Sequence, residues 1–201
     1  MRDFRDCLAE IPTPTAPFEM AATAHTRRWA RAHQLVTGER AARRFDRIDT
    51  GRFAGLCFPA RDAVDAGLLA DWTSWFCVFD DHVDEHGIDL AYEALPERLA
   101  RLHGVLTGEA TPASPIAVSL ADLWQRTAPR MPRHWRRRFV AHFADYFQGT
   151  VWEARLRIEN RIPSRAEYVP GRRSCVGMRP FTDLLEVALR RALPAAFTDT
   201  F

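Results

Sequence analysis

The sequence predicts an all-α protein, and three observations support that fold class. Apolar residues recur with helical spacing along almost the whole chain, and no pair of strand-like segments competes with this pattern. Signals that end helices fall between the periodic segments, namely Gly51, Gly87, Gly104 and the Ile162-Pro163 pair. The chain has 201 residues, of which 47% are hydrophobic, so one domain with a sizeable core is expected.

The expected elements follow the chain in order. A proline-rich segment over residues 1–18 precedes an α-helical domain over residues 19–201. Ser164 or Pro163 could begin the seventh helix, because both residue types are common at helix N-termini. Helices are expected at residues 19–36, 39–49, 61–86, 89–107, 113–128, 132–158, 165–176 and 180–196.

Composition excludes several classes of protein. All 28 basic residues are arginines and the net charge is only +2, so we expect no general attraction to nucleic acid. No apolar run approaches the roughly 20 residues that span a bilayer, and MRDFRDCLAE lacks the apolar core of a signal peptide. The cysteines form no CxxC pair. We therefore expect a cytoplasmic protein without a membrane span, in which Cys7, Cys57, Cys77 and Cys175 are free thiols.

The segment expected to form the helix over residues 61–86 ends in FDDHVDEH, a dense group of carboxylates after an aromatic run. At about 100° per residue, Asp80 and Asp84 lie together on the flank of an apolar stripe, whereas Asp81 points further round. Such acids are either a solvated helix end or a metal site. They oppose the helix dipole, which a divalent cation such as Mg²⁺ would offset. The stripe consists of Leu69, Trp72, Phe76, Phe79 and Val83.

The same stretch also satisfies the H-x-x-E-H pattern of one class of zinc peptidases. His82 and His86 would share a zinc ion on one helical face, with Glu85 as general base. A third ligand would come from Glu153 or Glu159. A solvent-exposed histidine pair without function is the simpler alternative.

A second informative stretch is RIPSRAEYVPGRRSCVGMRP, residues 161–180. Arg172 and Arg173 precede Gly177, and Tyr168 comes before them. Guanidinium groups bind phosphate bidentately, and glycine lets a ligand approach the backbone closely. An arginine near a glycine break is therefore a candidate phosphate ligand.

Together these stretches resemble the bacterial class I terpene synthases, or terpene cyclases. The resemblance runs over roughly residues 15–200 and rests on DWTSWFCVFDDHVDE, WEARLRIENRIPSRAEYVPGRRSCVG, LCFPARDAVDAGLLADW and TRRWARAHQLV, in the family's order and spacing. It implies a helical bundle around an apolar pocket whose mouth binds three Mg²⁺ ions and a prenyl diphosphate. The implied reaction ionises and cyclises that substrate, expected to be farnesyl diphosphate with geranylgeranyl diphosphate as the alternative, and releases pyrophosphate.

The resemblance also assigns roles to the acidic helix. Asp80 matches the main Mg²⁺ ligand and Asp84 the assisting one, whereas Asp81 is expected to hold a closing arginine. The aromatic side chains Trp72, Trp75, Phe76 and Phe79 would supply the wall of the pocket, where ring faces stabilise carbocations. Phe76, one turn before Asp80, is the residue most strongly expected to line it.

The second stretch receives roles in the same way. Arg173 matches the residue that senses pyrophosphate, with Arg172 as the second choice. Val176 matches the linker position, and Gly177 matches the effector whose carbonyl group faces the ionising carbon. Tyr168 is expected to contribute to substrate binding.

Two departures from the family pattern shape the expectation of activity. Pro170 and Gly171 are expected to interrupt the helix just before Arg172. The family's second metal motif, of the NDxxSxxxE type, and an Arg-Tyr pair do not occur in the sequence, whose only asparagine is Asn160. We therefore expect a C-terminally incomplete cyclase, or as the alternative a homologue that retains only diphosphate and Mg²⁺ binding. Its partly uncovered apolar stripe would make the chain marginally stable or drive it to form a homodimer.

Overall fold

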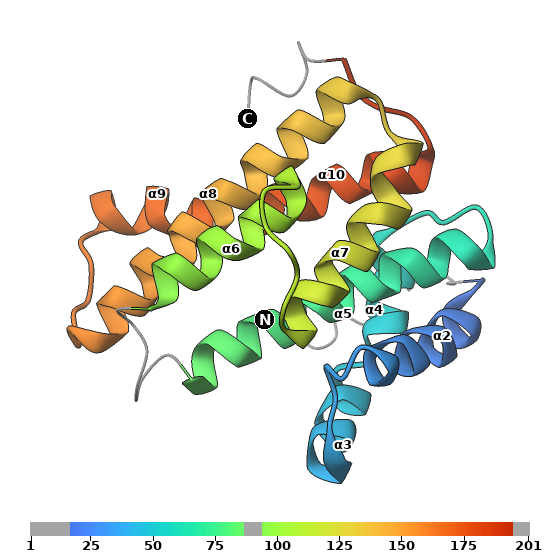
Figure 1. Cartoon of the computed structure of the whole chain (residues 1–201), viewed down its shortest axis with the longest axis horizontal. Coiled ribbons are helices and arrows are strands. Elements are labelled where there is room, and N and C mark those ends of the chain that lie inside the picture. Colours follow the sequence, from blue (N-terminus) through green and yellow to red (C-terminus); the bar gives the residue numbers. More distant parts are fainter. Residues whose placement is uncertain (1–16, 87–93, 195–201) are drawn as a thin grey trace, which may run out of the picture.

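The computed structural model describes residues 17–86 and 94–194, and within these ranges it contains helices and loops but no strand (Figure 1). The expected all-α architecture is therefore confirmed. The helices are α2 (Glu19–Ala32), α3 (Gly38–Ile48), α4 (Thr50–Cys57), α5 (Ala63–His86), α6 (Leu95–Thr107), α7 (Pro115–Thr127), the short 3₁₀ helix η1 (Ala128–Arg130), α8 (Arg133–Ile158), α9 (Arg165–Cys175) and α10 (Met178–Leu189).

Most expected helices are present with ends that differ by up to four residues. The helix expected over residues 180–196 ends at Leu189, and residues 89–93 of the helix expected over 89–107 lie outside the described residues. Helix α4 falls in a stretch that was expected to be a loop. Gly51, expected to end the preceding helix, lies inside α4. A Cβ atom at this position would lie 2.2 Å from Oγ1 of Thr23, so glycine allows α4 to pack closely against α2. The turn between α3 and α4 is made instead by Asp49, whose φ is 50°.

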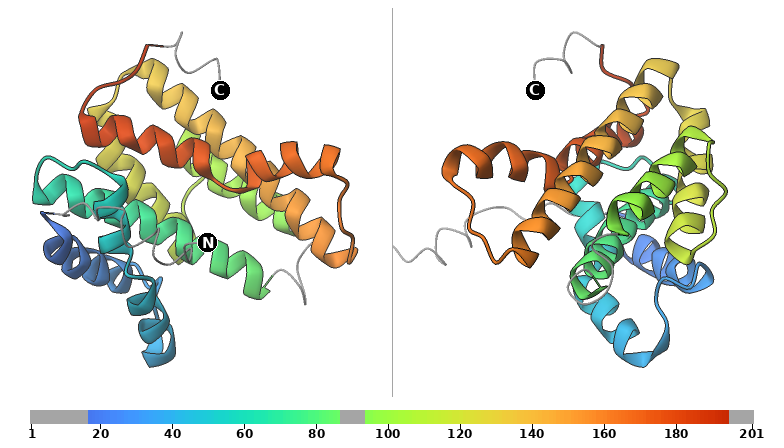
Figure 2. Two further views of the ribbon diagram at one scale, coloured as in Figure 1. Left: turned by 180° about the vertical axis from the view of Figure 1, so that it is seen from behind. Right: turned by 60° about the vertical axis from the view of Figure 1, so that its left-hand side comes forward.

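Helix α5 lies at the centre of the bundle. Helices α2 and α4 pack against it, α7 contacts it from another direction, and α10 runs beside α8 (Figures 1 and 2). The expected apolar stripe is buried, since Trp72 is 0% exposed and Phe79 is 3% exposed. Only Phe76 within the stripe is partly accessible, so the expectation of a partly uncovered stripe is wrong for its other four residues. Helical periodicity thus correctly predicted which face of α5 enters the core.

Aromatic rings join α5 to α8 along most of their shared length. The centroid of Trp72 lies 5.3 Å from that of Phe139, and the rings meet edge to face. Further along, the rings of Phe79 and Phe147 are 5.6 Å apart. Such pairs contribute about 0.5 to 1.5 kcal/mol each beyond the burial of their area. We call this set the aromatic ladder; it comprises Trp72, Trp75, Phe76, Phe79, Phe139, Phe143, Tyr146 and Phe147.

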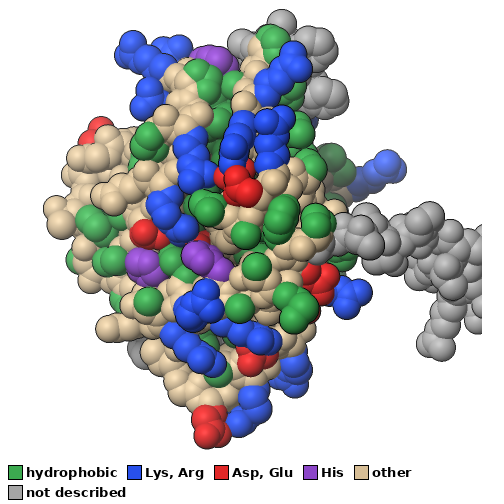
Figure 3. All heavy atoms as spheres, turned by 90° about the vertical axis from the view of Figure 1, so that its right-hand side faces the viewer, with side chains coloured by type: hydrophobic (Ala, Val, Ile, Leu, Met, Phe, Trp, Pro, Cys, Tyr) green, Lys and Arg blue, Asp and Glu red, His purple; other side chains and the backbone are tan. Residues whose placement is uncertain are grey.

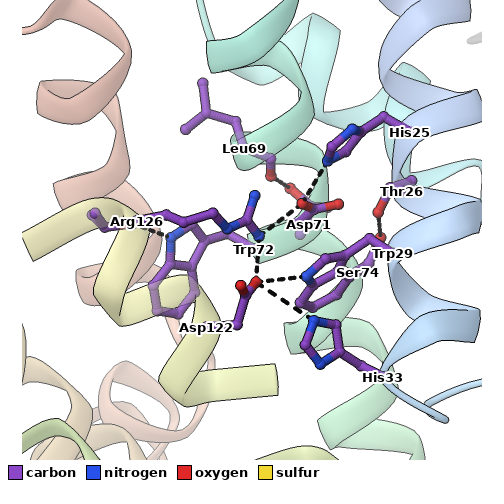
Figure 4. A network of polar contacts seen from close by, with 12 residues as sticks. His25, Thr26, Trp29, His33, Leu69, Asp71, Trp72, Ser74, Asp122 and Arg126 are labelled. Atoms are coloured by element: carbon purple, nitrogen blue, oxygen red, sulfur yellow. Dashed lines mark hydrogen bonds and ion pairs between the residues drawn. The ribbon is translucent and has the colours of Figure 1, made fainter. Parts of the chain in front are cut away.

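A buried polar network fastens α2, α5 and α7 together near the start of α5 (Figure 4). Asp71 is fully buried; its Oδ2 accepts a hydrogen bond from Arg126 at 2.9 Å and lies 3.0 Å from Nε2 of His25. Arg126 also pairs with Asp122 at 2.8 Å, and Trp29 donates to that same carboxylate at 2.7 Å. The charge of Asp71 is therefore balanced inside the protein rather than by solvent.

The surface carries charges of both signs. On the face seen in Figure 3, arginine side chains gather in an upper and a lower group, with acidic and apolar side chains among them. Within the described residues, no helix combines the length and apolar character needed to cross a membrane.

Replacing Asp71 by alanine should lower the free energy of unfolding by about 1 to 3 kcal/mol, because a partly buried guanidinium loses one of its acceptors. Urea denaturation followed by circular dichroism measures this change. Asp46→Ala is the matched control, since Asp46 forms a half-exposed ion pair with Arg27 and should cost less than about 1 kcal/mol. Equal effects of the two changes would show that the buried network contributes nothing special.

Candidate functional site

Asp80 lies in the C-terminal half of α5, beside the end of the aromatic ladder. The hydroxyl group of Tyr146, on α8, donates a hydrogen bond of 2.6 Å to Oδ1 of Asp80. Burial, and then the nearby charge of Asp80, raises the pKa of Tyr146 well above its ordinary value. The phenol therefore stays protonated near neutral pH and acts as the donor.

The neighbouring carboxylate has a different partner. Asp81 accepts a hydrogen bond of 2.5 Å from Nη2 of Arg44, on α3. Cys77 lies about one turn earlier on α5. Burial, and then the charges of Asp80 and Asp81, raise the pKa of its thiol to about 11. The backbone of α5 continues through Asp84, but the side chain of Asp84 lies outside the described residues.

A small polar pocket of about 160 Å³ opens beside Asp80 where α5, α8 and α9 meet. Two carboxylates, from Asp80 and Glu153, face two guanidinium groups, from Arg157 and Arg172. The remaining lining residues are Val83, Thr150, Cys175 and Val176. Burial, and then the charge of Glu153, raises the pKa of Cys175, so its thiol is neutral in this setting.

The structure brings Arg172, rather than Arg173, into the pocket with Asp80. Nη1 of Arg172 lies 3.6 Å from Oε1 of Glu153. Arg173 is exposed and makes no ion pair within residues 17–86 and 94–194. The expected role of Arg173 stays a prediction, while the pocket favours the second choice, Arg172.

Arg157 was not among the residues expected from the sequence. It lies on α8 one turn after Glu153, and both line the pocket. The spacing of four in WEARLR was the available signal, since residues i and i+4 share a helical face.

Helix α9 is continuous, so the interruption expected at Pro170 and Gly171 is wrong. Pro170 lies inside the helix, which runs from Arg165 to Cys175. Its start is strongly defined by a capping box, in which the Ser164 hydroxyl accepts from the amide of Glu167 and the Glu167 carboxylate accepts from the amide of Ser164. Ser164 is therefore the N-cap, which confirms one of the two residues expected to begin this helix.

Two glycines let α9 approach α8 closely. A Cβ atom on Gly149 would lie 2.4 Å from the backbone nitrogen of Cys175, and one on Gly171 would lie 2.4 Å from the ring of Trp152. Gly171 thus serves helix packing rather than a break. This close packing of α9 against α8 places Arg172 in the lining of the polar pocket.

The break in direction comes at Gly177, between α9 and α10. Gly177 is buried and has a φ of 67°, a left-handed conformation that other residue types adopt with strain. A Cβ atom there would lie 3.1 Å from the ring of Tyr146. Val176, just before it, is 39% exposed and lines the polar pocket.

The aromatic residues proposed to bind substrate separate into different environments. Phe76 is partly accessible and contacts Phe143 and Tyr146. Trp72 is fully enclosed, and its indole N–H donates to Oγ1 of Thr127 at 2.9 Å, so it serves as core. Phe79 lines a separate apolar cavity of about 310 Å³ between α5, α6 and α7.

Tyr168 lies away from the Asp80 pocket. Its side chain is 50% exposed and lines an outer groove between α8 and α9, together with Trp152 and Arg161. Arg172, Arg157 and Glu153 also reach that groove, so they connect the two hollows.

The alternative zinc site gains no support from the described side chains. His82 is exposed and lines the apolar cavity, whereas Glu153 lines the polar pocket. The side chains of Glu85 and His86 lie outside the described residues. Among the described side chains, no group of three or more His, Cys, Asp or Glu residues is placed to hold a metal. The carboxylates around Asp80 are oxygen donors, which suit a hard cation such as Mg²⁺.

Comparison with known proteins connects this geometry with one family. A family model described as terpene synthase family 2, C-terminal metal binding, matches residues 71–200, which is more than half of the chain. Pristinol synthase from Streptomyces pristinaespiralis is 30% identical over 198 residues, which cover 94% of this chain and 53% of that protein. (+)-T-muurolol synthase ((2E,6E)-farnesyl diphosphate cyclizing) from Roseiflexus castenholzii is 30% identical and is covered to 57%.

Solved structures agree with the sequence comparisons. Linalool/nerolidol synthase from Streptomyces clavuligerus, in complex with 2-fluorogeranyl diphosphate, superimposes with a TM-score of 0.80 at 29% identity. The match covers 90% of this chain and 62% of that one. The chain thus spans about half the length of the curated relatives it matches.

Gly149→Ala should displace α9 from α8 and lower the free energy of unfolding by about 1 to 3 kcal/mol, because the new methyl group overlaps backbone atoms. Thermal and urea unfolding test this expectation. Gln148→Ala, at the exposed neighbouring position, should change stability by less than about 0.5 kcal/mol. A Gly149→Ala variant as stable as the parent would mean that α8 and α9 are not held in the close contact described.

Proposed function

This chain belongs to the terpene synthase family, and on that basis we propose that the polar pocket around Asp80 binds the diphosphate group of a prenyl diphosphate together with Mg²⁺. Metal binding is named in the family's description. The reaction proposed for the whole protein is ionisation of the allylic diphosphate, cyclisation of the resulting carbocation and release of pyrophosphate.

The observation that carries the proposal is the composition of this pocket. Carboxylates from α5 and α8 line the pocket together with guanidinium groups from α8 and α9, and Tyr146 of the aromatic ladder donates a hydrogen bond to one of them, Asp80. Carboxylates together with substrate phosphates are the ligands that Mg²⁺ commonly uses in proteins. Guanidinium groups match phosphate oxygens in charge and geometry. An apolar chain attached to the diphosphate could then extend along the accessible ring of Phe76.

The proposed role of each charged residue follows from its position at the pocket. Asp80 would hold the cation, assisted by Asp84, while Asp81 stays engaged with Arg44. Arg172 and Arg157 would neutralise the oxygens of the diphosphate. The chemistry that Mg²⁺ supplies when bound is stabilisation of charge on the leaving group.

Residues around the helix break complete the proposed site. Gly177, whose carbonyl group accepts a hydrogen bond of 3.2 Å from the amide of Phe181 in this structure, would direct that carbonyl group toward the ionising carbon, and Val176 would connect that position to the arginines. Phe76 would present its ring face to the carbocation, and the apolar wall would exclude water. Arg173, taken from the family pattern, remains the alternative to Arg172, and Tyr168 would act only at the outer groove.

The proposed substrate is farnesyl diphosphate. The name of the T-muurolol synthase relative states that it cyclises (2E,6E)-farnesyl diphosphate, and the linalool/nerolidol synthase structure contains 2-fluorogeranyl diphosphate. Geranylgeranyl diphosphate is the longer alternative. We further propose that the protein acts in the cytoplasm.

Turnover by this chain is a separate question from binding. The sequence contains no NDxxSxxxE motif. The alternative function is Mg²⁺ and diphosphate binding without efficient cyclisation. Incubation with Mg²⁺ and farnesyl or geranylgeranyl diphosphate, followed by gas chromatography, separates the two: a cyclic hydrocarbon establishes the cyclase, and its absence despite binding establishes the alternative.

Asp80→Ala should abolish Mg²⁺-dependent binding of pyrophosphate while leaving the helical content unchanged, because Asp80 flanks the core instead of filling it. Isothermal titration calorimetry with Mg²⁺ and pyrophosphate measures the binding. Asp46→Ala serves as the control and should bind as the parent does. Binding that survives Asp80→Ala would remove the assignment, and Zn²⁺ binding lost in His82→Ala would favour the zinc hydrolase instead.

Exchanging arginine for lysine should distinguish the two adjacent arginines. Arg172→Lys keeps the charge but loses the planar fork, and we expect pyrophosphate affinity to fall by about tenfold, which corresponds to about 1.4 kcal/mol. Arg173→Lys should change it by less than about twofold, since Arg173 does not line the pocket. The reverse result would assign phosphate recognition to Arg173 and move the register by one residue.

A further inference from the structure

We propose that Tyr146 is a positioning residue that sets the orientation of the Asp80 carboxylate and couples it to the break between α9 and α10. This inference rests on the proposed role of Asp80 as a metal ligand. Tyr146 lies on α8, outside both the acidic stretch over residues 79–86 and the arginine-containing stretch over residues 161–180.

The hydrogen bond between Tyr146 and Asp80 has the properties of a positioning contact. It is short, at 2.6 Å, and joins the phenol oxygen to Oδ1 of Asp80. Tyr146 is only 2% exposed, and solvent therefore competes poorly for its hydroxyl group. A donor that approaches one carboxylate oxygen restricts rotation of the carboxylate and directs the second oxygen.

The ring of Tyr146 is itself held from several sides. Its centroid lies 5.7 Å from that of Phe76, 5.6 Å from that of Phe79 and 5.9 Å from that of Phe147. These rings belong to the aromatic ladder that joins α5 to α8. The hydroxyl position is thus determined by the packing of the core and does not depend on a flexible chain.

The same ring also meets the helix break. A Cβ atom on Gly177 would lie 3.1 Å from Cε2 of Tyr146, so the backbone at this turn rests directly against the ring edge. Val176, which lines the polar pocket, is the adjacent residue. A shift of the backbone at Gly177 would therefore press on the ring and displace the hydroxyl group that holds Asp80.

Two parts of the proposed site are joined in this way. Asp80, on α5, and the Val176–Gly177 turn, between α9 and α10, do not need to touch in order to respond to each other. Diphosphate bound by Arg172 at the end of α9 would bias the turn, and the turn would bias Asp80 through a single ring. Coupling of this kind is a free energy that binding experiments can measure.

Tyr146→Phe is the direct test, because it removes the hydroxyl group and keeps the ring in the aromatic ladder. We expect Mg²⁺-dependent pyrophosphate affinity to fall by roughly tenfold, the lower end of the effect of removing a partner of a metal-ligating carboxylate. Thermal stability without Mg²⁺ should change little. Thr73→Val is the matched control: it removes a buried hydroxyl group from α5 that bonds only to the carbonyl of Leu69, and its affinity should equal that of the parent.

Coupling to the helix break is tested by a double-mutant cycle with Gly177→Ala. The added methyl group should lower affinity in the parent, through backbone strain and contact with the ring. If the ring transmits the disturbance to Asp80 through its hydroxyl group, the same change should have a smaller effect in the Tyr146→Phe background. Fully additive effects would overturn the coupling.

The outcomes separate this inference from the proposed function. Unchanged or tighter binding in Tyr146→Phe, with binding still lost in Asp80→Ala, overturns the role of Tyr146 and leaves the metal site intact. Binding that persists in Asp80→Ala overturns the metal site and the role of Tyr146 with it. Equal losses of affinity in Tyr146→Phe and Thr73→Val would reduce the effect to general destabilisation and likewise overturn it.

Discussion

The aromatic contact between α5 and α8 is the constraint on which the rest of the structure depends. Both helices present large rings at helical spacing, and the rings interlock from Trp72 and Phe139 at one end to Phe79 and Phe147 at the other. Because rotamers of packed rings have little freedom, the two helices have a single register relative to each other. That register brings Tyr146 to Asp80, so the geometry of the polar pocket follows from the packing of the core.

The polar pocket lies at the end of the aromatic contact between α5 and α8, where charged side chains replace the rings. Close packing at Gly149 and Gly171 holds α9 against the outer side of α8, so Arg172 faces Glu153 across a short distance. Burial at this boundary also keeps Cys77 and Cys175 neutral by raising their pKa values. Neutral thiols neither compete for a hard cation nor repel a diphosphate. A site for charged ligands is thus made at the edge of the core without burying an unpaired charge.

Sequence alone predicted the elements whose signals are local. Helical periodicity located α5 and its buried face, and Ser164 was one of the two residues expected to begin α9, where the structure has a capping box. Features that depend on contacts distant in the chain were missed. Gly51 and Gly171 resemble breaks in sequence, but each is explained by a side chain from another helix that fills its open side. Tyr146 carried no motif at all, because its importance comes only from the residue that α5 places opposite it.

Helix geometry also explains why two consecutive aspartates have different surroundings. A step of one residue turns the side chain by about 100°, so Asp80 faces α8 while Asp81 faces α3. Asp80 meets a neutral donor, the Tyr146 hydroxyl group. Asp81 meets a full positive charge on Arg44, which already compensates it. Of these two carboxylates, Asp80 is therefore the one that a buried hydroxyl group from α8 orients beside the polar pocket, as the proposed metal ligand requires.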